Sequence, residues 1–304
     1  MKWIVVGGTG FVGTNLCMRL KEAGHEVVAV DIRYPRQELR DKSLDRFMRY
    51  DIRVPFGPVV LPALKGADVM VMLAAISGLD SCARDPLGSF DVNVRGVVHT
   101  LDSCVKLGIP KFVFASSGAV MAGYKGSWDE YSIVKPESVY GGQKAAAEAM
   151  VQAYDRDYPD LTATSLRFSN IFGPWSEHKT SAVHKFVRSV IDEEPLQVVG
   201  SGDQQRDFVH VDDVCRAIAA VVCGEGKLNS VYNVGTGKGT TVRELAELVI
   251  HEAGEGSASF QSPGSVGALK SVMQIGEISM WVGWKPVVEL EDGVRALIEW
   301  YMDR

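Results

Sequence analysis

Short apolar runs bounded by turn residues alternate along the chain with longer stretches in which apolar side chains recur every three or four positions. Short runs are typical of buried strands, and periodic stretches are typical of amphipathic helices. We expect strands at Lys2–Val6, Glu26–Val30, Ala67–Ala75, Lys111–Ala115, Ala163–Phe168, Leu196–Val199, Arg206–Val209 and Val231–Val234. We expect helices at 11–24, Pro86–Leu107, Val139–Tyr158, Ser181–Glu193, Val211–Val222, Thr241–Ala253 and Asp292–Met302, with a loop at Glu255–Gly267.

Strand and helix alternate regularly up to residue 169, and the pattern is less regular beyond it. Such alternation predicts βαβ units and an α/β fold with a doubly wound parallel sheet of the Rossmann type. We expect this Rossmann domain at 1–169, with the chain returning to it around 207–236. Residues 170–304 are expected to form mainly a smaller C-terminal α/β domain.

The first predicted strand runs directly into a glycine-rich turn that opens the first helix. Gly8, Gly10 and Gly13 have the spacing of the dinucleotide fingerprint, and Gly7 adds a second, overlapping spacing. Glycines permit the tight turn, the approach of backbone to a pyrophosphate and close helix packing, while the helix N-terminus attracts phosphate. The turn therefore predicts a site for NAD or NADP. Its predicted contacts are Gly7, Gly10, Phe11, Val12 and Gly13.

The end of the second predicted strand carries the acid that usually completes this fingerprint. A carboxylate at Asp31 can accept a hydrogen bond from the adenosine ribose and repels a 2′-phosphate, which favours NAD. Arg33 lies close by in the sequence, and its guanidinium could hold a 2′-phosphate or contact the adenosine. We therefore predict NAD, with NADP left open by Arg33.

Further cofactor contacts are predicted where the chain leaves the sheet. The small side chains of Ala74 and Ala75 would let the backbone pass close to a cofactor. Asp51 lies either near the adenine ring or on a surface loop, and this alternative stays open. An Asn inside a helix is usually solvated, but Asn93 is expected to face the carboxyl edge of the sheet. The predicted contacts are Asp51, Ile52, Leu73, Ala74, Ala75 and Asn93.

Ser117, Tyr140 and Lys144 form a candidate catalytic set. Ser117 ends a predicted strand, and Tyr140 and Lys144 are one turn apart at the start of a predicted helix. A phenol has a pKa near 10, and a nearby ammonium lowers it by favouring the phenolate. Such a set can move a proton while a hydride passes between an alcohol carbon and NAD, with Tyr140 and Lys144 also touching the cofactor. A chance pair on a helix surface is the alternative.

The composition bounds the class of protein. Hydrophobic residues make up 46% of the 304 residues and charged residues 23%, as in ordinary soluble domains. The net charge of −6 argues against nucleic-acid binding through charge. The five cysteines are odd in number and lack CxxC spacing, which argues against a metal site or disulfides. Without a membrane-length apolar run or a signal-peptide pattern, we expect a cytoplasmic protein that does not bind a membrane.

With these motifs, the chain resembles the extended short-chain dehydrogenases/reductases, in the NAD-dependent nucleotide-sugar epimerase/dehydratase group, and especially its UDP-glucose/galactose 4-epimerases. The resemblance covers nearly the whole chain. Besides the glycine turn and the Ser-Tyr-Lys set, it rests on 166–174 (LRFSNIFGP), 206–214 (RDFVHVDDV) and 283–286 (GWKP). Simple dehydrogenases of the superfamily lack this additional set.

The resemblance implies a nucleotide-sugar substrate held by the smaller domain. Asn170 and Arg206 would contact the nucleotide diphosphate, and Ser117 the sugar. For Arg206 the alternative is a solvated arginine paired with Asp203 or Asp207. His210 would be structural. The resemblance also implies a homodimer formed through the helices at 86–107 and 139–158.

Several positions depart from the family pattern. Gly118 and Ala119 stand where family dehydratases and decarboxylases place an acid, which argues against those reactions. Met121 stands where the family has a substrate-lining tyrosine. A phosphate-binding arginine of the family is replaced near Ser265 or is missing. A small residue near Ser271 would leave room for a larger substituent at C2 of the sugar.

Together with the Ser117, Tyr140 and Lys144 set, the resemblance implies C4 epimerisation of a UDP-hexose through a transient 4-keto sugar, with NAD regenerated in each cycle. One alternative is a 4-keto nucleotide-sugar reductase or dehydrogenase with net cofactor turnover. A dinucleotide-binding regulatory or scaffold protein is another, against which the intact Ser117, Tyr140 and Lys144 set speaks. The sequence leaves the sugar and the nucleotide open.

Overall fold

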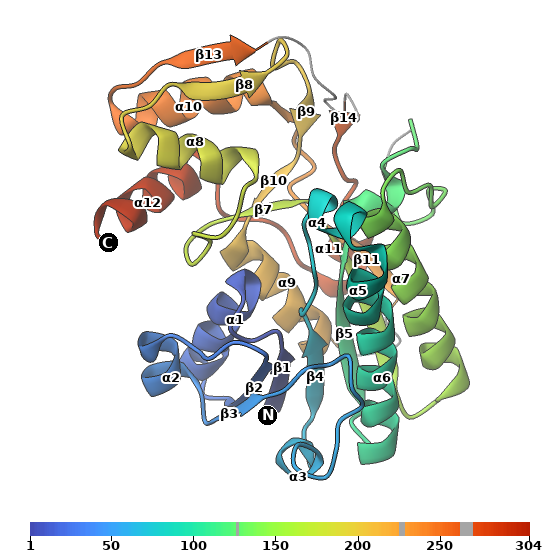
Figure 1. Cartoon of the computed structure of the whole chain (residues 1–304). Coiled ribbons are helices and arrows are strands. Elements are labelled where there is room, and N and C mark those ends of the chain that lie inside the picture. The colour runs from blue at the N-terminus through green and yellow to red at the C-terminus, as the bar shows by residue number, and fades with distance from the viewer. Residues whose placement is uncertain (126–127, 225–228, 262–269) are drawn as a thin grey trace. The chain divides into compact units, whose positions relative to one another are not determined.

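The computed structural model describes residues 1–125, 128–224, 229–261 and 270–304, which form two compact units (Figure 1). The first unit comprises Met1–Tyr124, Ile133–Arg167 and Ile218–Tyr232. The second comprises Lys125–Ser132, Phe168–Ala217 and Asn233–Arg304. The chain thus returns to the first unit over a shorter stretch than the expected 207–236.

Most of the predicted elements lie within a few residues of their expected bounds, and several short elements, such as β3, β7, α3, α4 and α11, were not predicted. The strands are β1 (Lys2–Val6), β2 (Glu26–Asp31), β3 (Arg46–Arg49), β4 (Val69–Met72), β5 (Lys111–Ser117), β6 (Thr162–Phe168), β7 (Asn170–Phe172), β8 (Leu196–Val199), β9 (Gln205–Arg206), β10 (Phe208–His210), β11 (Val231–Val234), β12 (Thr240–Thr241), β13 (Ala258–Gln261) and β14 (Lys270–Ser271). The helices are α1 (Phe11–Glu22), α2 (Gln37–Ser43), α3 (Leu61–Leu64), α4 (Leu79–Arg84), α5 (Pro86–Phe90), η1 (Asp91–Arg95), α6 (Gly96–Leu107), η2 (Gly118–Met121), α7 (Val139–Asp157), α8 (Ala182–Ile191), α9 (Val211–Cys223), α10 (Val242–Ala253), α11 (Gly276–Val282) and α12 (Leu290–Met302).

The central sheet is a doubly wound Rossmann sheet, as predicted. Its seven strands lie in the order β11-β6-β5-β4-β1-β2-β3, so the direction of winding reverses between β1 and β4. The strand β1 pairs in parallel with both β2 and β4. Helices α1 and α2 lie on one face, and α5, α6 and α7 lie on the other (Figure 1). Because both faces are covered, strands such as β4 are continuous apolar runs, and Val69–Met72 are fully buried.

The second unit has its own hydrophobic core among α8, α10 and α12. Residues from all three helices and from the short strands meet there, including Phe172, Val187, Leu196, Leu245 and Leu297. The strands form small sheets, β10-β7, β12-β9-β14 and β13-β8. The unit is therefore the smaller α/β domain that the sequence predicts, although its sheets are more fragmented.

Two expectations for individual elements are wrong. The predicted helix Pro86–Leu107 is helical from end to end, with the π-helical turn η1 between α5 and α6. The predicted strand Arg206–Val209 is divided into β9 and β10, because Asp207 turns its carboxylate inward to other partners. The predicted loop at Glu255–Gly267 contains β13, which pairs in parallel with β8. These features depend on partners distant in sequence, which periodicity does not reveal.

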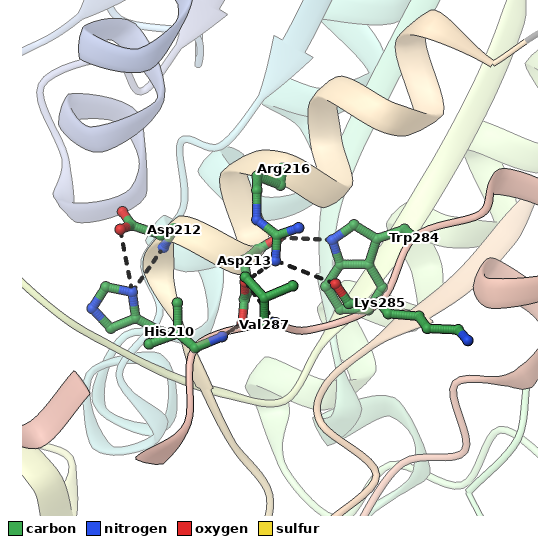
Figure 2. A network of polar contacts seen from close by, with 8 residues as sticks. His210, Asp212, Asp213, Arg216, Trp284, Lys285 and Val287 are labelled. Atoms are coloured by element: carbon green, nitrogen blue, oxygen red, sulfur yellow. Dashed lines mark hydrogen bonds and ion pairs between the residues drawn. The ribbon is translucent and has the colours of Figure 1, made fainter. Parts of the chain in front are cut away.

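Two of the family-like segments are joined by one buried carboxylate, that of Asp213 (Figure 2). It is fully buried and accepts hydrogen bonds from Arg216, from the backbone N–H of Val287 at 3.1 Å and from that of Val288 at 3.1 Å. The backbone carbonyl of Asp213 accepts from Nε1 of Trp284 at 3.1 Å. The segment 283–286 therefore binds the start of α9.

His210 lies in the same network and is packed against Phe172. Its ring centroid is 5.3 Å from that of Phe172, and its Nδ1 lies 3.6 Å from the Asp212 carboxylate. It is 5% exposed. This surrounding fits the structural role expected for His210.

Of the helices in the described ranges, none combines the length and hydropathy needed to cross a membrane.

Candidate active site

The glycine turn between β1 and α1 has the shape that a dinucleotide site requires. Gly7 has φ of 87°, and a Cβ there would lie 2.5 Å from the Ala74 nitrogen. A Cβ on Gly13 would lie 2.1 Å from the Gly7 carbonyl oxygen. The first turn of α1 has no side-chain cap and no acidic residue, so its N–H groups suit a phosphate. The predicted contacts Gly7, Gly10, Phe11, Val12 and Gly13 thus lie together in a turn that fits NAD.

Replacing Gly13 with alanine is expected to weaken NAD binding by about 10- to 100-fold, because overpacking against fixed backbone costs about 1–3 kcal/mol. Isothermal titration with NAD would measure this change. Gly276→Ala is the matched control, since a Cβ at Gly276 meets no atom within 4 Å. Equal NAD affinity in Gly13→Ala and the wild type would contradict a cofactor site at this turn.

The carboxylate of Asp31 is held at the end of β2. Its oxygens accept hydrogen bonds from the backbone N–H of Thr9 at 3.2 Å and from that of Arg33 at 3.1 Å. The acid is therefore fixed beside the glycine turn, where the fingerprint requires it. Arg33 is exposed, and its contact with the adenosine stays a prediction.

Asp51 and Ile52 have clear partners within the chain. The carboxylate of Asp51 forms an ion pair with Arg53, at 2.6 Å between Oδ2 and Nη2, and this hydrogen bond lowers the pKa of Asp51. Ile52 is buried, and a Cβ added to Gly96 would lie only 2.7 Å from the Cδ1 atom of Ile52. Contacts of these two residues with the adenine stay a prediction.

The segment after β4 lies against the glycine turn. The backbone N–H groups of Leu73 and Ala74 both donate to the carbonyl of Val6, at 2.8 and 3.0 Å. Leu73, Ala74 and Ala75 are each half-buried. The backbone of Leu73 and Ala74 thus lies at close range to the glycine turn, and contacts of these residues with NAD stay a prediction.

Asn93 joins this cofactor-side segment to the catalytic helix. It lies in the π-helical turn η1, a feature frequent at functional sites. Its Oδ1 accepts from the Ile76 N–H at 2.9 Å, and its Nδ2 donates to the Ile76 carbonyl at 3.0 Å and to Oε1 of Gln143 at 2.8 Å. Asn93 is fully buried, so the solvated alternative is wrong. A direct contact with NAD stays a prediction.

Ser117, Tyr140 and Lys144 meet at the carboxyl end of β5. Ser117 caps the turn η2, with its Oγ accepting from the Ala119 N–H at 3.2 Å, and it hydrogen-bonds the Tyr140 side chain. Lys144 is 2% exposed and donates to the Ala115 carbonyl at 2.6 Å. Its Nζ is 5.9 Å from the centroid of the Tyr140 ring. The alternative of a pair on the helix surface is therefore wrong.

The pKa of Tyr140 differs from the expectation. Burial raises it to about 12, and the hydrogen bond with Ser117 opposes this rise. Among the protein groups burial outweighs the hydrogen bond with Ser117, so the net change of the pKa is upward. The phenol is a hydrogen-bonded, neutral acid in this environment, and further positive charge is needed to make it a base near neutral pH.

Asn170 and Arg206 lie in the second unit, around Asp207. Asn170 donates to the Asp207 carbonyl from its backbone at 3.0 Å and from Nδ2 at 3.1 Å. Arg206 donates from Nη1 to the Gln205 carbonyl at 2.8 Å, and burial lowers the pKa of its guanidinium. Both residues are half-buried, and the diphosphate contacts expected of them stay a prediction.

Asp207 itself organises this region. It is fully buried, and its carboxylate accepts from the backbone and hydroxyl of Thr236 at 2.8 and 2.7 Å and from the Gly237 N–H at 3.1 Å. Its backbone N–H donates to the Ser271 carbonyl at 3.0 Å. The carboxylate of Asp207 therefore holds the loop at 236–237, and its backbone N–H holds β14. Both segments are distant in sequence from Arg206.

The departures from the family pattern have a partial structural explanation. Met121 is fully buried, and its sulfur accepts from Nη1 of Arg167 at 3.6 Å, so this side chain fills the interior. Gly118 and Ala119 form the start of η2. Ser271 is half-buried in β14 and pairs with Arg206. Ser265 lies outside the described residues.

Three buried residues near the site were missed by sequence reasoning. Gln143 binds Asn93, Glu148 pairs with Arg167, and Asp207 fixes the loops around Arg206. The signal for Glu148 was available, since it continues the four-residue spacing of Tyr140 and Lys144 on one face of α7. For Gln143 the sequence contains no comparable signal.

Comparison with known proteins agrees with this geometry. Residues 3–235 match the NAD dependent epimerase/dehydratase family, and the chain belongs to this family. Its cofactor is accordingly NAD. A dTDP-glucose 4,6-dehydratase of Streptomyces niveus is 28% identical, over 100% of this chain and 93% of the relative.

Solved structures of similar proteins cover the whole chain. The UDP-glucose 4-epimerase of Thermotoga maritima, solved with UDP-glucose, has a TM-score of 0.91 and 28% identity, over 100% of this chain and 99% of that one. The UDP-glucuronic acid 4-epimerase of Bacillus cereus, solved with UDP-glucuronic acid and NAD, has a TM-score of 0.90 and 25% identity, with the same coverage. The family resemblance and the Rossmann fold expected from the sequence are thus confirmed.

Proposed function

We propose that this protein is an NAD-dependent nucleotide-sugar 4-epimerase that acts on a UDP-hexose. The observation that carries the proposal is the meeting of Ser117, Tyr140 and Lys144 at the end of β5, in the sheet whose first strand carries the glycine turn. The solved 4-epimerases of similar fold support the reaction class.

The cofactor is expected to be held by Gly7, Gly10, Gly13 and Asp31. Bound NAD would supply a hydride acceptor and donor, together with the positive charge of its oxidised nicotinamide ring. The amides at the start of α1 suit its pyrophosphate, and the Asp31 carboxylate suits the adenosine ribose.

The proton steps belong to Tyr140. Its phenolate would take the proton of the C4 hydroxyl and later return a proton to the same oxygen, after the 4-keto sugar has presented its other face. Ser117 would hold that oxygen by a hydrogen bond, as it now holds the Tyr140 side chain. Lys144 would keep a positive charge beside the phenol and is expected to contact the nicotinamide ribose.

One feature supports epimerisation over the dehydration catalysed by a related family member. Gly118 and Ala119 cannot transfer protons to a sugar carbon. In the second unit, Asn170 and Arg206 are proposed to bind the diphosphate, for which a guanidinium is well suited. A substrate tethered through its diphosphate can turn its sugar ring between the two half-reactions.

The experiment is incubation of the purified protein with UDP-galactose, UDP-N-acetylgalactosamine and UDP-galacturonate, without added reductant. Chromatography of the nucleotide sugars should show conversion of at least one to its C4 epimer. If none of them is interconverted, the proposal for UDP-sugars is wrong. A 4-keto nucleotide-sugar reductase would instead consume NAD(P)H, and its cofactor would be lost during gel filtration.

The homodimer implied by the family resemblance is part of the same proposal. It would form through α5, α6 and α7, which lie together on one face of the central sheet (Figure 1). Analytical ultracentrifugation should give twice the chain mass of 33.1 kDa.

A further inference from the structure

A buried ion pair lies behind the catalytic residues. Nε of Arg167 is 3.0 Å from Oε1 of Glu148, and Nη2 of Arg167 is 2.9 Å from Oε2, which makes the contact bidentate. Both side chains are only 3% exposed. Arg167 lies in β6, and Glu148 follows Lys144 by one turn of α7.

The same ion pair contacts both ends of the turn that carries Ser117. The Ser116 hydroxyl donates a hydrogen bond to Oε1 of Glu148. At the other end of the turn, Nη1 of Arg167 donates to the sulfur of Met121 at 3.6 Å. The chain from Ser117 to Val120 is therefore held between two side chains that are anchored on the pair.

Stability alone does not account for this arrangement. Replacing a buried ion pair with apolar residues of similar volume is often neutral or stabilising, because desolvation offsets the attraction between the charges. What apolar side chains cannot provide is directional bonding to Ser116 and Met121. The pair fixes α7, β5 and β6 relative to one another at the place where Ser117 must meet Tyr140.

We propose that Glu148 and Arg167 are positioning residues that hold the Ser117 hydroxyl against Tyr140. The expected effect on kcat rests on the proposed function. The expected effect on the position of the Ser117 turn requires no substrate. Catalytic geometry is sensitive to such support, since a misplacement of about 1 Å can cost about 100-fold in rate.

The first test is kinetic and uses the double variant Glu148→Leu/Arg167→Met. We expect its melting temperature to stay within about 4 °C of the wild type. We expect kcat to fall by about 100-fold, with KM for the nucleotide sugar changed less than about threefold, because the pair does not touch substrate. Asp157→Asn, at the exposed end of α7, is the control for loss of a carboxylate and should match the wild type. A double variant with wild-type kcat would overturn the proposal.

The second test is hydrogen exchange, which decides the question even if the double variant does not fold or the wild type lacks epimerase activity. The variants are Glu148→Gln and Ser116→Ala. In both, exchange of the Ala119 amide, which donates to Ser117, should accelerate about 10-fold more than exchange of the β1 and β2 amides, whose rates report global stability. Unchanged exchange in the 117–121 turn would overturn the inference. An inactive wild type with accelerated exchange in the variants would refute only the proposed function.

Discussion

Replacing Tyr140 with phenylalanine should lower kcat by about 1,000-fold and leave the fold intact. Positioned proton transfer contributes about 100- to 10,000-fold, and no other phenol is placed beside Ser117 and Lys144 in the described part of the chain. The variant removes one oxygen from a half-buried side chain, so thermal unfolding should barely change. Tyr158→Phe, on an exposed tyrosine at the end of α7, is the control and should retain wild-type kcat.

The pH dependence of the wild type and of Lys144→Met extends this test. Burial raises the pKa of Tyr140 to about 12. Because the proposed base is the phenolate, activity should rise with pH until the phenol is ionised. A positive charge lowers the pKa of a phenol. Removing the ammonium of Lys144 should therefore move the rate profile to higher pH and reduce activity most near pH 7. A profile unchanged by Lys144→Met would show that Tyr140 is not the titrating base.

Replacing Asp207 with alanine should destabilise the protein by about 3–5 kcal/mol and weaken the binding of UDP. The carboxylate is fully buried and accepts from two groups of Thr236 and from the Gly237 N–H. Each buried donor left without an acceptor costs about 1–3 kcal/mol, and relaxation offsets part of the sum. Asn170 donates a hydrogen bond to the Asp207 carbonyl, and Arg206 directly precedes Asp207 in the chain. Because these two residues are the proposed diphosphate contacts, loss of the carboxylate should also weaken UDP binding.

Urea unfolding and calorimetric titration with UDP would measure the two effects of Asp207→Ala. Asp203→Ala is the matched control, because Asp203 is exposed and bonds the hydroxyl of the nearby Ser201 at 2.6 Å. It should change the free energy of unfolding by less than about 0.5 kcal/mol. If Asp207→Ala unfolds at the wild-type urea concentration, the role assigned to its carboxylate is wrong.

The buried strands β1, β2, β4, β5 and β6 and the longer helices of the first unit follow closely from the sequence because their signals are local. A buried parallel strand is a continuous apolar run, and the amphipathic helices carry their own periodicity. The glycine turn is equally local, since the backbone of Gly7 and Gly13 must adopt a shape that side chains would obstruct. For the same reason Tyr140 and Lys144 could be placed on one helical face from spacing alone.

The less predictable features depend on residues far apart in sequence. Asp207 divides a predicted strand because its acceptors meet donors at 236 and 237, and η1 surrounds an Asn93 bonded to Gln143. The strand β13 is mostly exposed and has no apolar run that would mark it in the sequence. It is a strand because its backbone pairs with β8. Spacing in a sequence contains no information on such partners.

By itself, the sequence determined the Rossmann sheet, the dinucleotide turn, the Ser-Tyr-Lys set and the family. The tertiary structure alone decided that the pKa of the Tyr140 phenol is raised, that Asn93 is an internal link, that Glu148 pairs with Arg167, and that the Asp207 carboxylate is buried among backbone donors. The physical reason is that backbone conformation and periodicity are set by neighbouring residues. Burial and the pairing of polar groups are set by whichever segments the fold brings together.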